Sequence, residues 1–256
     1  CEVSLVGPNR DLHSGIYGGA VDNPAMVLCQ MLAQLRDSQG RVKVPGFYDD
    51  VQALSRLERS QARKFPLKDE AMARSLGVRA LFGEKGYLTV ERRAARPTLE
   101  INGLTSGYQG EGSKTIIPSK ASAKITCRLV PSQDPRKILR LLKRHLQSIC
   151  PKTVRLHFEA GHSGKAYVTA PDGPYAKAAM DALEVAFGKE PILMREGGSI
   201  PIVTEFKEVL GADTLLLGLG LPDDNAHSPN EKMSLTAFTK GMHMSAALWQ
   251  NLAAHS

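Results

Sequence analysis

Alternation of apolar and polar positions predicts four β-strands in the N-terminal part of the chain. The first covers residues 2–6, EVSLV, where Val3 and Leu5 share one face and where Gly7 and Pro8 then end the run. Three later segments, RPTLEIN, KASAKITCRLV and TVRLHFE, repeat this alternation. Their inward-facing positions are expected to be Leu99 and Ile101, then Ala121, Ala123, Ile125, Cys127 and Leu129, and finally Val154, Leu156 and Phe158.

Two predicted helices separate these strands and begin in the same way. Asn23 is placed to cap the first helix, with Pro24 at its first position, and Asp134 and Pro135 repeat this arrangement in the second. The apolar stripe of the first helix consists of Val27, Leu28, Met31, Leu32 and Leu35. The order strand, helix, strand, strand, helix, strand predicts an α+β ferredoxin-like domain, with two helices on one face of an antiparallel sheet and the other face free. Residues 41–95 are expected to be an insertion of short helices.

A change in composition at GHSGKAYVTAPDGP predicts a domain boundary, with residues 1–165 before it and residues 166–256 after it. The second part shows helical and strand patterns in turn: a helix over about 175–187, a short strand ILM, a helix after GGSIP, a buried strand TLLLGLG and a last helix through Leu235, Phe238, Met242 and Leu248. Such alternation indicates part of an α/β layer with a parallel sheet. The chain starts at Cys1 and not at Met, and a strand follows at once, so we expect a piece of a longer protein.

Charge and composition narrow the possible functions. The net charge of +7 comes mostly from scattered residues, and the basic run DPRKILRLLKRHL is typical of a solvated helix face, so we do not expect nucleic-acid binding. No stretch approaches the roughly 18 apolar residues of a membrane helix, and the start resembles no signal peptide, which favours a cytoplasmic protein. Three of the four cysteines, Cys29, Cys127 and Cys150, lie within apolar patterns and are interpreted as small buried side chains in a reducing compartment.

Three segments carry candidate chemistry. His13 lies in DLHSGIYGGAVDNP, between an acid and a glycine-rich turn, where a metal ligand, a catalytic base, a substrate clamp and a turn residue are all possible. In REGGSIP, two glycines allow a close backbone approach, and Ser199 at a helix start leaves N–H groups for an anion, although an ordinary capped turn fits equally well. His227, in NAHSPNEKM, follows a predicted buried strand, where ligands gather in open α/β sheets, but a lone loop histidine is more often structural.

Five segments, in this order, carry a resemblance to a known family: DLHSGIYGG, GEGSKTIIP, CRLVPSQDP, REGGSIP and AHSPNE. They resemble the motifs of the zinc-dependent dipeptidase and amidohydrolase family that includes cytosolic nonspecific dipeptidase (carnosinase), aminoacylase and succinyl-diaminopimelate desuccinylase, and most closely its dipeptidase branch. The resemblance covers nearly all of the chain. It implies a ferredoxin-like lid domain that forms a homodimer, followed by the C-terminal part of an α/β catalytic domain whose N-terminal part is absent.

The resemblance also implies roles for individual residues. His13 would reach the active site of the partner subunit and stabilise the oxyanion of the tetrahedral intermediate. Arg128, on the free face of its strand, would clamp the substrate carboxylate with its guanidinium fork, and Glu196 would meet the substrate's amino end. His227 would be the last metal ligand. Further substrate-binding residues would be Thr115, His162, Gly198 and Ser199.

The chain departs from the family in its metal ligands. Two zinc ions, or manganese or cobalt in their place, need a second histidine, a bridging aspartate, further carboxylates and a glutamate as general base. The family supplies these from an H-x-D motif and a pair of adjacent glutamates, and neither occurs here. We therefore expect this chain alone to be inactive and to bind metal weakly or not at all, while its intact parent would hydrolyse dipeptides or N-acyl amino acids by metal-activated water. The alternative is a stand-alone, non-catalytic dimerisation module that pairs through the free sheet face.

Overall fold

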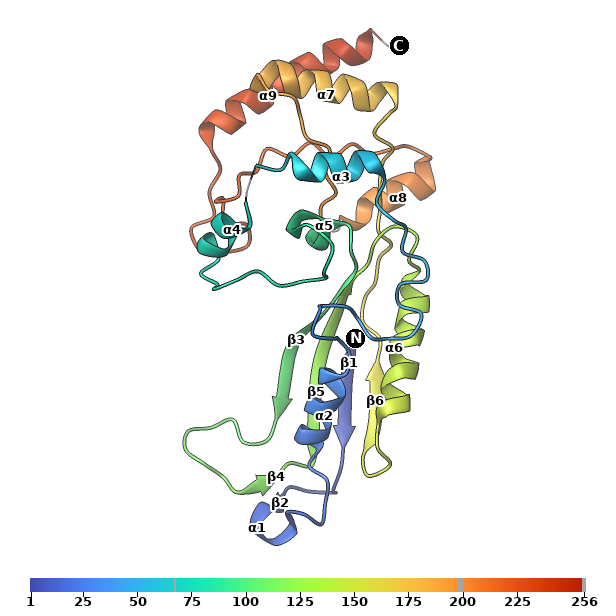
Figure 1. Ribbon diagram of the computed structural model, residues 1–256, viewed down its shortest axis with the longest axis vertical. Coiled ribbons are helices and arrows are strands. Elements are labelled where there is room, and N and C mark those ends of the chain that lie inside the picture. The colour runs from blue at the N-terminus through green and yellow to red at the C-terminus, as the bar shows by residue number, and fades with distance from the viewer. Residues whose placement is uncertain (67, 198–199, 255–256) are drawn as a thin grey trace. The chain divides into compact units, whose positions relative to one another are not determined.

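A computed structural model of the chain describes residues 1–66, 68–197 and 200–254. The chain divides into two compact units (Figure 1). The first unit consists of Cys1–Tyr167 together with Arg195–Pro201, and the second consists of Val168–Met194 and Ile202–Ser256. The short segment Arg195–Pro201 therefore belongs to the first unit, although both of its flanks belong to the second.

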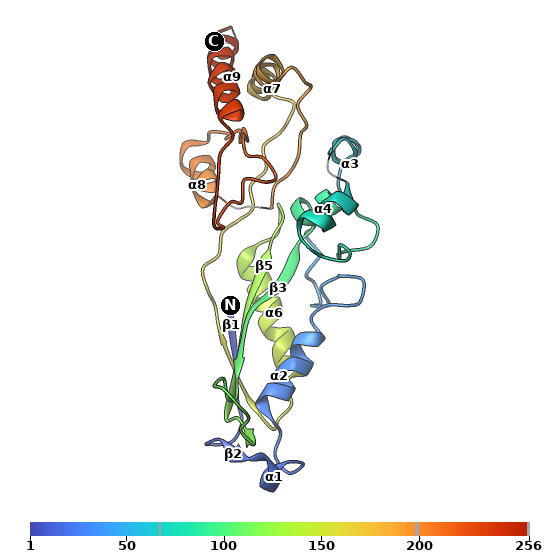
Figure 2. The ribbon, with the colours of Figure 1, turned by 90° about the vertical axis from the view of Figure 1, so that its left-hand side faces the viewer.

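The first unit is built on a four-stranded sheet. Its strands are β1 (Glu2–Val6), β3 (Thr98–Ser106), β5 (Lys120–Arg128) and β6 (Arg155–Glu159). They lie in the order β3-β5-β1-β6, and all three pairings are antiparallel. The helices α2 (Pro24–Ala33) and α6 (Pro135–Ile149) lie on one side of this sheet (Figure 2). The predicted strands and helices thus form at the expected places in the chain.

Alternation in the strands and stripes on the helices explain the core of this unit. Val3 and Leu5 are fully buried in β1, and Ala121, Ala123 and Ile125 of β5 are almost fully buried. The core between sheet and helices includes Val27, Leu28, Met31, Leu32, Ile125, Ile138, Leu142 and Leu146. Both predicted helix caps form: Asn23 Oδ1 accepts from the Ala25 N–H at 2.9 Å, and Asp134 Oδ1 accepts from the Lys137 N–H at 2.6 Å. Each removes one unpaired backbone donor from a helix start.

Two expectations about buried side chains are wrong. Ile101 is 46% exposed, because β3 is the edge strand and α2 packs over β1 and β5 instead. Cys29 is exposed, because it follows the buried Leu28 by one position and therefore points about 100° away from the buried stripe of α2. Cys127 does lie partly buried against the core, and this burial raises the pKa of its thiol to about 11.

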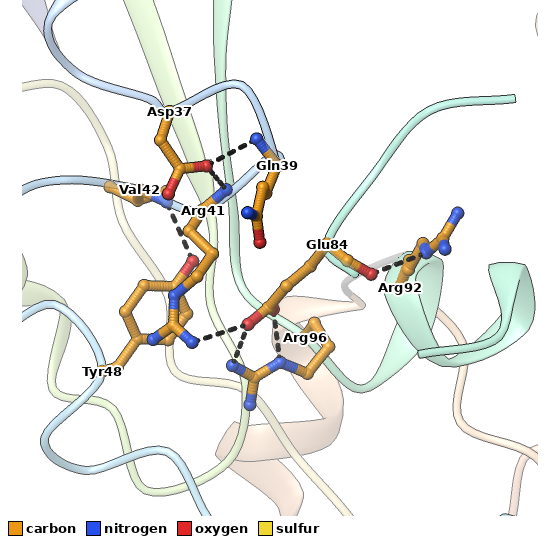
Figure 3. A network of polar contacts seen from close by, with 8 residues as sticks. All are labelled: Asp37, Gln39, Arg41, Val42, Tyr48, Glu84, Arg92 and Arg96. Atoms are coloured by element: carbon orange, nitrogen blue, oxygen red, sulfur yellow. Dashed lines mark hydrogen bonds and ion pairs between the residues drawn. The ribbon is translucent and has the colours of Figure 1, made fainter. Parts of the chain in front are cut away.

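The predicted insertion contains three short helices, α3 (Arg56–Arg63), α4 (Asp69–Ser75) and α5 (Thr89–Ala94). A buried ion pair holds this insertion to the rest of the unit (Figure 3). Arg96 donates to both carboxylate oxygens of Glu84, from Nε at 2.7 Å and from Nη2 at 2.9 Å. Arg41, in the segment after α2, approaches the same carboxylate at 3.5 Å, and Arg92 Nε donates to the Glu84 carbonyl at 3.0 Å. One carboxylate therefore joins the two ends of the insertion.

The second unit contains the helices α7 (Pro174–Phe187), α8 (Pro201–Leu210) and α9 (Leu235–Ala253). Small buried side chains of α7, among them Ala178 and Ala182, allow α7 and α9 to pack together, and Asn251 Nδ2 donates to the Ala178 carbonyl at 3.0 Å. The helix α7 ends at Phe187, and Gly188 caps it with a φ of 67°, the left-handed conformation that favours glycine. Among the described residues, no helix is long and apolar enough to cross a membrane.

The strands expected in this unit are absent from its described part. The segments 192–194 and 214–220 have no regular secondary structure, and Leu216, expected to be buried, is 61% exposed. A strand forms only where a neighbouring strand accepts its backbone hydrogen bonds, and a buried parallel strand also needs cover on both faces. None of the described residues of this unit provides such a neighbour. The apolar run TLLLGLG is therefore compatible with a strand, but it is not sufficient to form one.

Candidate functional site

His13 lies in a small structured turn beside the main sheet. It ends the two-residue strand β2 (Leu12–His13), which pairs antiparallel with β4 (Ile116–Ile117), and it caps the single-turn helix α1 (Ser14–Tyr17). The imidazole is exposed, and its Nδ1 accepts a hydrogen bond from the Gly15 N–H at 3.1 Å. A neutral histidine whose Nδ1 accepts carries its proton on Nε2. His13 can therefore present an N–H donor to a group outside the turn.

Thr115 lies directly beside this turn. The Ser14 N–H donates to the Thr115 carbonyl at 3.0 Å. This hydrogen bond joins the residue after β2 to the residue before β4. Asp11 fixes the other side: its Oδ1 accepts from the Ser119 N–H at 2.8 Å and from the Ser119 hydroxyl at 2.9 Å. Of the sequence-predicted site residues, His13 and Thr115 are thus neighbours, and both lie near the start of β5.

Arg128 lies at the opposite end of β5. It is the last residue of that strand, pairs with Thr98 of β3, and has an exposed side chain. Since β5 is 9 residues long, a rise of about 3.3 Å per residue separates its two ends by roughly 25 Å. Two residues in extended conformation span only about 7 Å. His13 and Arg128 of one chain therefore cannot contact the same dipeptide.

Two other predicted substrate-binding residues, His162 and Glu196, lie elsewhere in the first unit. His162 is exposed in the irregular segment after β6. Glu196 is exposed as well, and its Oε1 accepts from the Gly197 N–H at 2.9 Å and lies 3.9 Å from Arg93 Nη2. Gly198 and Ser199 lie outside the described residues.

His227 lies in a turn of the second unit. Its φ of 62° is in the left-handed region, its side chain is exposed, and its N–H donates to Glu231 Oε2 at 3.3 Å. Across residues 1–66, 68–197 and 200–254, no group of three or more His, Cys, Asp or Glu side chains could hold a metal ion. The donor set of the described chain thus does not fit a catalytic metal, which needs at least three protein ligands. That His227 is a ligand stays a prediction.

Sequence reasoning missed one residue near the candidate site, Glu58. The pattern SRLE at Ser55–Glu58 is a recognisable capping box, and the structure confirms that box at the start of α3. The same carboxylate, however, also binds Arg195, which lies 137 positions further along the chain. No local pattern in the sequence indicates that second contact.

The pKa of Asp11 gives a testable pH dependence. Hydrogen bonds from the Ser119 backbone and hydroxyl lower this pKa below its ordinary value of 3.8, so the bonds favour the ionised carboxylate. The hydrogen bonds between Ser119 and the ionised Asp11 therefore stabilise the turn fully above about pH 4. They are lost as the pH falls through the pKa of Asp11 in the folded chain, which is lower than the ordinary value. In an NMR titration, the Ser119 amide resonance should shift with a midpoint below 3.8.

The shift should vanish in Asp11→Asn and persist in Asp37→Asn, which changes a different turn aspartate. A midpoint at or above 3.8 in the wild type would mean that the Ser119 hydrogen bonds do not lower the pKa of Asp11.

Known proteins match both parts of the chain. Residues 1–154 match the model of the peptidase dimerisation domain family. The chain is 32% identical to the Cys-Gly metallodipeptidase of Schizosaccharomyces pombe and covers 54% of it, with 99% of this chain aligned. It is 29% identical to the human Beta-Ala-His dipeptidase and covers 49% of it, with 96% of this chain aligned. The chain thus spans about half the length of these curated relatives.

Solved structures give the same result. The di-peptidase Dug1p from Saccharomyces cerevisiae superimposes with a TM-score of 0.83 at 33% identity, over 98% of this chain and 53% of that one. Human carnosine dipeptidase 1 gives a TM-score of 0.82 at 28% identity, over 99% of this chain and 54% of that one. The match extends beyond the first unit, since nearly all of this chain is aligned in both cases.

Proposed function

The chain belongs to the peptidase dimerisation domain family, and from this premise we propose that it is part of a metal-dependent dipeptidase. In this proposal the first unit is a lid of ferredoxin-like topology that pairs two subunits. The second unit is the C-terminal part of a catalytic domain. Support comes from the match of residues 1–154, from alignment of nearly the whole chain with metallodipeptidases, and from the strand order of the main sheet.

The observation that carries the proposal is the separation of His13 from Arg128 along β5. Both side chains are exposed and suited to negatively charged groups, yet roughly 25 Å of strand lies between them. A dipeptide can therefore contact both side chains only if His13 and Arg128 come from two different chains. In a two-fold dimer, the pairing of one subunit's Arg128 with the partner's His13 occurs twice. Two equivalent active sites therefore form, each with one Arg128 and the partner's His13.

The described residues then contribute binding and charge stabilisation. The Arg128 guanidinium offers paired N–H donors to the substrate carboxylate, and the Glu196 carboxylate attracts the substrate ammonium. His13 donates its Nε2 proton in a hydrogen bond to the carbonyl oxygen as negative charge develops there. The described residues of this chain do not provide the ligands for a catalytic metal ion. A zinc, manganese or cobalt ion would therefore need ligands from outside this chain. A cytoplasmic location stays a prediction from the sequence.

Peptide hydrolysis by the full-length protein, meaning this chain with whatever adjoins it in its gene, tests the proposal. With Zn²⁺, Mn²⁺ or Co²⁺ supplied in separate assays, it should hydrolyse dipeptides that have free amino and carboxyl ends. Amidation of the dipeptide carboxylate should lower kcat/KM by about tenfold or more, because the Arg128 fork then meets no anion. The 256-residue chain alone should be inactive.

A full-length dimer that hydrolyses neither dipeptides nor N-acyl amino acids would overturn the proposal and favour the non-catalytic dimerisation module instead.

A further inference from the structure

The segment that carries Glu196 is held by an ion pair with the helical insertion. Arg195 donates to Glu58 Oε1 from Nε at 2.8 Å, and its Nη2 lies 2.5 Å from the same oxygen. The two side chains are only 22% and 29% exposed, which limits the screening of the pair by water. Arg195 is adjacent in sequence to Glu196, so a fixed guanidinium also restricts the backbone that aims the Glu196 carboxylate.

Glu58 is well placed to act as an anchor because its own position is fixed. Its Oε2 accepts from the Ser55 N–H at 2.7 Å, and its N–H donates to Ser55 Oγ at 3.2 Å. The two carboxylate oxygens thus have separate partners, one at the start of α3 and the other on Arg195. Burial raises the pKa of Glu58, but the hydrogen bonds from Ser55 and the charge of Arg195 outweigh it, so the pKa is lowered and the carboxylate stays ionised.

A second contact holds the other side of the segment against α5. The backbone of Gly197 lies so close to the Arg93 carbonyl that a Cβ at this position would stand 2.4 Å from its oxygen. Arg93 also approaches Glu196, at 3.9 Å. The two helices are joined in turn by Arg59 of α3 and the buried Glu91 of α5, at 3.8 Å. Residues 195–197 are therefore held against both α3 and α5.

We propose that α3 and α5 form a platform that positions the substrate-contacting segment, and that Glu58 is a positioning residue that acts through Arg195 on Glu196. This inference rests on the proposed function for the role of Glu196. It assigns a purpose to the insertion, whose sequence alone indicates none. Because Glu58 does not touch substrate, its loss should mainly weaken binding of the substrate's amino end and raise KM, with a smaller effect on kcat.

The substitution Glu58→Gln tests the docking in the 256-residue chain itself. Glutamine can still accept the Ser55 N–H in the capping box, so α3 keeps its cap while the ion pair with Arg195 is lost. Native-state digestion with an arginine-specific protease, followed by mass spectrometry, measures cleavage after Arg195 relative to cleavage after Arg155 in β6. This ratio should rise about tenfold in Glu58→Gln, because local opening exposes the segment without unfolding the sheet.

Glu70→Gln removes an exposed first-turn carboxylate from α4 and is the matched control, in which the ratio should stay within twofold of the wild type. If Glu58→Gln unfolds the whole unit, both cleavage rates rise together, the ratio stays constant, and the proposal is overturned. A ratio within twofold of the wild type for any other reason overturns it as well.

Kinetics of the full-length protein provide the second measurement. Glu58→Gln should raise KM for dipeptides about tenfold while kcat changes less than threefold, and Glu70→Gln should change neither. An unchanged KM in Glu58→Gln overturns the positioning role. If the wild-type protein hydrolyses no dipeptide, the proposed function fails instead, and the protease ratio still decides whether Glu58 holds the segment.

Discussion

An equal mixture of His13→Ala and Arg128→Ala subunits of the full-length protein should recover about a quarter of the wild-type rate, although each variant alone is nearly inactive. The reason lies in the length of β5, which keeps His13 and Arg128 of one chain from sharing a substrate. In a mixed dimer, one site combines an intact Arg128 with the partner's intact His13, while the other site carries both defects. Random mixing makes about half of the dimers mixed, each with one working site of two.

Each single variant should lose on the order of a hundredfold in kcat/KM, the usual cost of removing an oxyanion donor or a paired carboxylate clamp. Equal amounts of the two variants are mixed under conditions that exchange subunits, and dipeptide hydrolysis is followed over time. As a control, Arg128→Ala is mixed with Glu196→Ala. The proposal puts these two residues of one chain in the same site, so no mixed dimer has an intact site and no recovery is expected. Recovery in the control, or none in the first mixture, would contradict a site shared between subunits.

The parts of this fold that follow from local patterns could be read from the sequence. The strands β1 and β5 follow from period-two alternation, and the starts of α2 and α6 follow from a capping side chain before proline. The exposure of Ile101 could not be read in this way, because it depends on which strand lies at the sheet edge. The missing strand at 214–220 has the same explanation, since a strand depends on a neighbour that no local pattern specifies.

The candidate site shows the same limit. His13 and Thr115 come from segments whose motifs the sequence displays, and the structure brings them together through the pairing of β2 with β4. The contact of Glu58 with Arg195 depends instead on the packing of the insertion, across 137 positions of sequence. A capping glutamate is usually expected to serve only its own helix. The second role of Glu58 therefore emerges only from the folded chain.

Glu84→Gln should destabilise the first unit by about 3–5 kcal/mol, the cost of breaking a buried ion pair from one side. Glu84 and Arg96 are only 6% and 8% exposed, and the substitution leaves the Arg96 guanidinium buried without its counter-charge. Arg96 also stacks over the rings of Tyr48 and Tyr87, at 5.1 Å and 4.4 Å from their centroids. Both rings attract the guanidinium and so favour its buried position. Urea unfolding followed by circular dichroism measures the loss.

Two further variants separate the charge from its surroundings. Glu100→Gln removes an exposed carboxylate that lies 3.5 Å from Arg36, and it should cost less than about 1 kcal/mol because water already screens that pair. The double variant Glu84→Leu with Arg96→Met removes both buried charges at once, so it should be more stable than Glu84→Gln, since no unpaired charge remains inside the unit. If the double variant were the less stable of the two, the ion pair itself would be the source of stability. If the double variant is the more stable, the large loss of stability in Glu84→Gln comes from the buried Arg96 guanidinium that has lost its counter-charge. The Glu84 carboxylate is then needed because Arg96 is buried beside it.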